Sequence, residues 1–136
     1  MSPALASPST QPLTFLAFDF GARRVGVATG NSLTRTATPL TTVAAEGEAR
    51  MAAIEALIRE WRPAALVVGV PFHPDGAAHE NTERARRFGR QLQARFGLPV
   101  REVDERYTTT DAKHAGGVDL DAGAAAIILE QHLAGL

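Results

Sequence analysis

The chain has 136 residues, a formal net charge of −1 at pH 7 and no cysteine. This length predicts one domain with a substantial core. The near-neutral charge excludes a global basic field of the kind that drives nonspecific nucleic-acid binding. Without cysteine there is no disulfide framework and no thiolate metal site, so any metal ion would be held by carboxylates, histidines or water.

Residues 1–12 are rich in proline, serine and alanine. They lack the basic start and the long apolar core of a signal peptide, so we expect a disordered tail before a single domain over 13–136. No apolar run approaches the length that crosses a bilayer. We therefore expect a soluble cytoplasmic protein without a membrane partner, present as a monomer or weak dimer.

Three extended segments open the domain. The run Phe15–Phe18 is apolar without a break, which predicts a strand covered on both faces, spanning about 13–20. Further strands are predicted at 24–29 and at 37–43, the latter rich in threonine. Short turns join these segments, so they are predicted to form an antiparallel meander.

Helices and strands then alternate. Apolar residues at helical spacing predict the helices, and short apolar runs between turn signals predict buried parallel strands. The predicted elements are, in order, a helix over 46–61, a strand at 65–70, a helix over 81–96, a strand at 99–103, a short helix over 108–115 and a final helix from Asp119 to Leu133. This order predicts an α/β fold, in which a mixed five-stranded sheet of three antiparallel strands and then parallel βαβ units carries helices on both faces.

Three carboxylates occupy positions that can converge. Asp19 ends the first apolar strand, where a charge is costly unless a metal ion, a hydrogen-bonded turn or a polar substrate compensates it. Glu105 follows the last strand, and Asp121 lies in the first turn of the final helix. Alone, Glu105 also fits a solvated turn and Asp121 a helix N-terminus favoured by the dipole, whereas Asp19 is harder to explain as a turn cap because its setting is apolar. Their convergence at one sheet edge would favour a divalent cation with hard oxygen ligands, Mg²⁺ or Mn²⁺.

Four ordered blocks of the sequence resemble the YqgF family, bacterial RNase H-like proteins described both as Holliday junction resolvases and as pre-16S rRNA nucleases. The blocks are Asp19–Ala28, Leu66–Pro71 with Asp75-Gly76, Phe96–Thr109 and Asp121–Leu129. The match spans about 15–133. The chain departs from the family at Phe72-His73-Pro74, where Leu-Asn-Met is frequent, and at Ala122-Gly123, where Ser-Leu is common.

The resemblance implies an RNase H-like fold and a metal-dependent endonuclease, a phosphodiester hydrolase that trims the 5′ end of the 16S rRNA precursor in ribosome biogenesis. It implies that Asp19, Glu105 and Asp121 are the catalytic residues and the ligands of Mg²⁺ or Mn²⁺. Two alternatives stay open. One is a Holliday junction resolvase on the same acidic site, which needs a symmetric dimer because two strands are cut. The other is a non-catalytic module that binds rRNA.

Cationic side chains near these acids are candidates for contacts with nucleic acid, either structured RNA such as the rRNA precursor or, alternatively, a DNA junction. Arginine holds phosphates well because its guanidinium presents several donors in a fixed plane. The candidates are Arg23, Arg24, Arg106, His73 and Arg87. For Arg87 there is a simpler interpretation, namely that it lies on the solvent-exposed face of an amphipathic helix, where charged residues are routine.

Overall fold

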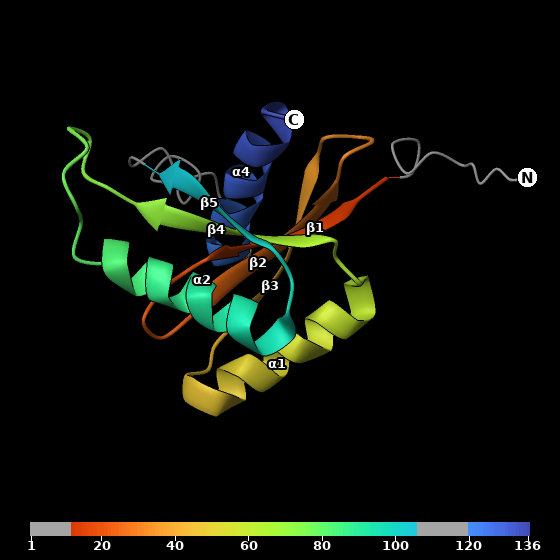
Figure 1. Cartoon of the computed structure of the whole chain (residues 1–136), viewed down its shortest axis with the longest axis horizontal. Coiled ribbons are helices and arrows are strands. Elements are labelled where there is room, and N and C mark those ends of the chain that lie inside the picture. The colour runs from red at the N-terminus through yellow and green to blue at the C-terminus, as the bar shows by residue number, and fades with distance from the viewer. Residues whose placement is uncertain (1–11, 106–119) are drawn as a thin grey trace, which may run out of the picture.

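The computed structural model describes residues 12–105 and 120–136. A five-stranded mixed sheet lies at the centre, with strand order β3-β2-β1-β4-β5 and helices on both faces (Figure 1). The strands are β1 (Thr14–Asp19), β2 (Val25–Asn31), β3 (Ala37–Val43), β4 (Ala65–Pro71) and β5 (Val100–Glu105). The helices in these residues are α1 (Gly47–Trp61), α2 (Thr82–Phe96) and α4 (Leu120–Ala134).

The predicted architecture is confirmed. Strand β1 pairs antiparallel with β2 and parallel with β4, and β4 pairs parallel with β5. The predicted helix over 108–115 and the tail, apart from Pro12, lie outside the described residues. None of the helices in the two described stretches is long and apolar enough to cross a membrane.

Strand β1 is buried on both sides, which explains its unbroken apolar sequence. Phe15 and Ala17 pack with residues of α4, whereas Leu16 and Phe18 belong to the larger core beneath α1 and α2. Successive side chains of a strand point to opposite faces, so the odd-numbered residues of β1 face α4. Asp19 is the last residue of the strand and is odd-numbered, so it faces the same side as Phe15 and Ala17, the side of α4.

Helix α4 lies close against β2 because both surfaces carry small residues. Ala28 packs against Ala125 and Ala126. A Cβ on Gly30 would lie within 3.2 Å of the Leu129 and Leu133 side chains. The absence of larger groups therefore lets the helix run along β2, and this brings the first turn of α4 to the end of the strand beside Asp19.

Several strand ends differ from the sequence prediction by one residue, and two differ by two residues; pairing with neighbours accounts for these two. Strand β2 runs on to Asn31 because that residue pairs with Thr14. Strand β5 runs on to Glu105 because that residue pairs with Pro71. Glu105 is therefore the last residue of its strand, whereas the sequence pattern placed it just after the strand.

Candidate active site

Asp19 lies between two glycines on the neighbouring strands. It is paired with Gly26 on β2 and with Gly69 on β4. Residues directly paired in a sheet project to the same face. The side chain of Asp19 is therefore directed to the side of the sheet that α4 covers, and a side chain at either glycine would be directed to the same side.

The carboxylate of Glu105 occupies the space that a side chain at Gly69 would take. A Cβ added to Gly69 would overlap the Oε2 atom of Glu105 and the side chain of Ile128 on α4. Glu105 is 7% exposed, so its carboxylate is buried beside the strand that neighbours β1. A glycine within a strand often marks such a close approach of another group.

The first turn of α4 occupies the corresponding space on the other flank of Asp19. A Cβ on Gly26 would overlap the main-chain carbonyl of Asp121. The side chain of Asp121 is 21% exposed and forms an ion pair with Arg24, with 2.9 Å between Oδ2 and Nη2. Arg24 itself lies just before β2, so this ion pair joins the start of the helix to the β1–β2 turn.

Asp19, Glu105 and Asp121 thus come from β1, β5 and α4 to one edge of one sheet face. Their carboxylate oxygens are ligands that hard divalent cations prefer. Within residues 12–105 and 120–136, no set of three or more acidic, histidine or cysteine side chains is close enough to form a metal site. The donor chemistry fits such a cation, while the carboxylate of Asp121 is directed to Arg24.

The structure brings most of the predicted phosphate-binding residues to this edge. Arg23 is exposed in the β1–β2 turn. His73 is exposed in the loop after β4, and the preceding Phe72 donates its N–H to the main-chain oxygen of Glu105 at 2.9 Å. Arg87 lies on α2, across the sheet from α4, and so is not brought to the carboxylates. Arg106 lies outside the described residues.

Arg50 on α1 fixes the turn that follows Asp19. It is buried, and its Nη2 donates to the main-chain oxygens of Gly21 and Ala22, both at 3.0 Å. Its Nε donates to the oxygen of Ala45 at 2.8 Å. Burial lowers the pKa of Arg50 from its ordinary value, and the nearby Glu46 opposes this shift. The guanidinium thus holds the β1–β2 turn from the face opposite α4.

Sequence reasoning missed Gly26, Gly69 and Arg50. The two glycines had a signal, because each interrupts a run of valines in a predicted strand, and that pattern indicates a close approach. Arg50 had none, since an arginine near the start of an amphipathic helix is indistinguishable from an ordinary solvated residue.

Known proteins match almost the whole chain. The family model described as RuvX, Holliday junction resolvase, matches residues 13–135. A protein of Polaromonas sp. is 69% identical over 123 residues, covering 90% of this chain and 89% of the relative. One of Albidiferax ferrireducens is 63% identical over 135 residues, covering 94% and 86% respectively. Both bear the name "Putative pre-16S rRNA nuclease".

Among solved structures, RuvC of Thermus thermophilus superposes with a TM-score of 0.53 at 15% identity, covering 90% of this chain and 95% of RuvC. T. thermophilus RuvC in complex with a Holliday junction substrate gives a TM-score of 0.54 at the same identity. RuvC has an RNase H-like fold. The fold implied by the sequence resemblance is therefore confirmed.

Proposed function

This chain belongs to the RuvX family of Holliday junction resolvases, and we propose that it is a nuclease that hydrolyses phosphodiester bonds at Asp19, Glu105 and Asp121. The observation that carries this proposal is the pair of glycines beside Asp19. Gly69 makes room for the carboxylate of Glu105, and Gly26 makes room for the start of α4 with Asp121. The two positions without side chains place the Glu105 carboxylate and the first turn of α4 beside Asp19, and this supports a chemical role for the three acids.

We propose the precursor of 16S rRNA as the substrate, cut near its 5′ end. Relatives that are 69% and 63% identical over most of the chain bear the name "Putative pre-16S rRNA nuclease", and the 5′ end is what the sequence resemblance implies. Such a substrate would place the protein in the cytoplasm, as a factor in ribosome biogenesis.

The three carboxylates would together hold Mg²⁺ or Mn²⁺, which when bound lowers the pKa of a water molecule and stabilises charge on the phosphate. Glu105 is held in place by burial and by the pairing of its strand with β4. Arg24 neutralises Asp121. We propose that Arg24 exchanges this carboxylate for a substrate phosphate, since guanidinium binds both groups in the same planar geometry.

Two exposed side chains would guide the substrate to the acids. Arg23 lies in the turn directly after Asp19 and is free to reach a phosphate from the solvent side. His73 follows the residue that is hydrogen-bonded to the main chain of Glu105, so a strand crossing this loop would pass the acidic edge. We propose both as contacts with nucleic acid, with Arg106 as a further candidate from the sequence.

Holliday junction cleavage is the second candidate function. The description of the matching family model favours it. This activity requires two copies of the acidic edge related by two-fold symmetry, because two strands of the junction are cut. A monomer in solution would therefore count against it.

The experiment that tests the function offers the purified protein two substrates in Mn²⁺, a 5′ fragment of the 16S rRNA precursor and a four-way DNA junction. We expect cleavage of the RNA, and its loss when EDTA removes the metal. Cleavage that persists in EDTA would contradict the metal-dependent site. Paired symmetric nicks in the junction, with intact RNA, would favour the resolvase, and binding of RNA without any cleavage would favour a non-catalytic module.

A further inference from the structure

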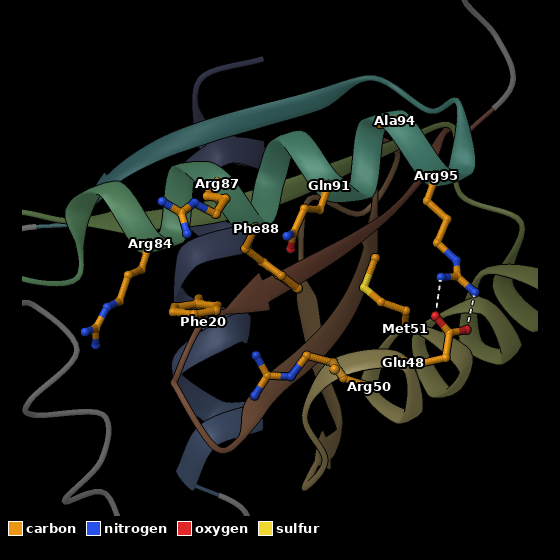
Figure 2. A pocket seen from close by; sticks show the side chains of 11 residues that line it. Phe20, Glu48, Arg50, Met51, Arg84, Arg87, Phe88, Gln91, Ala94 and Arg95 are labelled. Carbon is orange, nitrogen blue, oxygen red and sulfur yellow. Dashed lines mark hydrogen bonds and ion pairs between the residues drawn. The ribbon is translucent and has the colours of Figure 1, made fainter.

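A groove lies between α1 and α2, on the face of the sheet opposite α4. Its volume is about 730 Å³, which lies within the range of roughly 300–1,000 Å³ that is typical of small-ligand sites. Figure 2 shows Met51 and Phe88 between the two helices, and Phe20 at one end of the groove. Their side chains give the groove an apolar floor. The groove is therefore large enough for a nucleotide and has a surface against which a base can pack.

The groove is positively charged. Arg84 and Arg87 extend from α2 at the end near Phe20 (Figure 2). In the part of the chain that the structure describes, neither of them forms an ion pair with a carboxylate. Two neighbouring arginines of α2 that do not line the groove differ, because Arg86 is paired with Glu102 and Arg90 with Glu83. Arg84 and Arg87 therefore face the groove without a close ion pair, and the only acid that Arg87 is seen to influence is Glu83, whose pKa it helps to lower from the same helix in the described part of the chain.

The two ends of the groove are different. At one end the Arg95 guanidinium donates to both carboxylate oxygens of Glu48, at 2.7 and 2.6 Å, and this contact joins α2 to α1. At the other end lies Phe20, the residue directly after Asp19. Consecutive Cα atoms are about 3.8 Å apart, so the open, basic end of the groove begins one residue from the proposed catalytic edge.

We propose that this groove binds a single-stranded segment of the RNA substrate that continues from the acidic edge around the β1–β2 turn. Arg84 and Arg87 would contact its phosphates, and a base would lie against Phe20 and Met51, the partly exposed residues of the apolar floor. The proposal rests on the nuclease function stated above. It names the form of substrate that function takes, namely RNA with an unpaired extension beside the cleavage site.

The charge of the groove argues against the other occupants. A second copy of this chain docked symmetrically on the groove would set arginines against arginines, which is unfavourable. A purely apolar ligand would leave Arg84 and Arg87 without partners. A polyanion with planar apolar groups satisfies both features, and single-stranded RNA combines phosphates with bases that pack on apolar and aromatic side chains.

The test measures the binding of a labelled RNA hairpin, with and without a single-stranded extension, by fluorescence anisotropy in EDTA. In EDTA no cleavage is expected, so the result reports on the groove even if the proposed catalytic function fails. The variant is Arg84→Gln/Arg87→Gln. We expect it to bind the extended hairpin about tenfold more weakly, as the loss of two charge-assisted contacts predicts. The slope of log K against log salt should fall by about 1.4, since each phosphate contact to a single strand contributes about 0.7.

The matched control is Arg86→Gln/Arg90→Gln, which removes the same charge from the same helix outside the groove. We expect it to bind the extended hairpin as the wild type does. Gln91→Glu is a second variant, which adds a carboxylate to the groove and should weaken binding of the extended hairpin only. Equal losses in the two double variants, or equal losses for both hairpins, would overturn the proposal. Unchanged RNA binding with weaker binding of a polyglutamate peptide would also overturn it, in favour of an acidic protein partner.

Discussion

At the scale of single residues, the absence of two side chains shapes the candidate site. Gly26 and Gly69 are the partners of Asp19 on its two neighbouring strands. The backbone of Asp121 fills the space over Gly26, and the carboxylate of Glu105 fills the space over Gly69. A methyl group at either position would displace an acid that we propose to be catalytic.

Gly69→Ala tests this directly. The new methyl group would overlap the Glu105 carboxylate and Ile128, so we expect a loss of stability of about 1–3 kcal/mol, typical of overpacking in a core, together with a large loss of cleavage. Urea unfolding and the cleavage rate measure the two effects. Gly123→Ala is the control, because nothing lies within 4 Å of its Cβ position, and the helix should gain about 0.5–1 kcal/mol. Full activity in Gly69→Ala would contradict the arrangement.

His132 on α4 predicts a pH dependence of stability. Its ring packs edge-on against Phe15 at 5.3 Å, and its Nε2 is buried without a hydrogen-bond partner among the described residues. Burial, and to a lesser extent Arg101, lowers the pKa of His132 below its ordinary value of 6.5. The unfolded chain therefore takes up this proton first as the pH falls, and the free energy of unfolding decreases below about pH 6.5.

The variant His132→Phe keeps the aromatic contact and removes the titrating nitrogen. We expect it to lose this part of the pH dependence, so that the wild type alone is destabilised between about pH 6.5 and pH 5.5. Urea unfolding of both proteins across this interval is the measurement. Parallel curves for the two proteins would show that His132 does not titrate in this way.

At the scale of elements, the sequence predicts more of the fold than of the site. The apolar run of β1 and the helical spacing of apolar residues in α1 and α2 predict which residues are buried. The structure shows β1 buried on both faces and one buried face on each of these helices. The ends of β2 and β5 were misplaced because pairing with Thr14 and Pro71, rather than local composition, decides where these strands stop.

The contacts of the candidate site depend on how separate elements meet, so they were harder to predict. The ion pair of Arg24 with Asp121 requires α4 to lie along β2, and small residues far apart in the sequence make that packing possible. The basic groove likewise requires α1 and α2 to lie side by side, and no local pattern in either helix contains that information.

The hydrogen bonds by which Arg50 attaches α1 to the β1–β2 turn can be tested by mutation. Arg50→Ala would remove three hydrogen bonds from a buried guanidinium to main-chain oxygens, so we expect a loss of about 2–3 kcal/mol in the free energy of unfolding. Arg59→Ala on the same helix is the control. Its exposed ion pair with Glu55 is worth about 0.5 kcal/mol or less. Similar losses in both variants, measured by urea unfolding, would contradict this role of Arg50.

At the scale of the whole molecule, the two faces of the sheet have different chemistry. The face under α4 carries the acids at its edge, and the face under α1 and α2 carries the basic groove (Figures 1 and 2). The β1–β2 turn lies between them, with Asp19 before it and Arg24 after it. On the proposal made above, this near-neutral protein would bind a polyanion through arginines gathered in the groove, such as Arg84 and Arg87, instead of through its net charge.

The most direct test of the account compares wild type and Asp19→Asn in the cleavage of a 5′ fragment of the 16S rRNA precursor with Mn²⁺. Asparagine has nearly the same shape as aspartate but lacks the charge, so we expect an intact fold with an unchanged melting temperature and cleavage reduced to background. Equal cleavage rates for the two proteins would contradict the assignment of Asp19, and with it the acidic edge as the catalytic site.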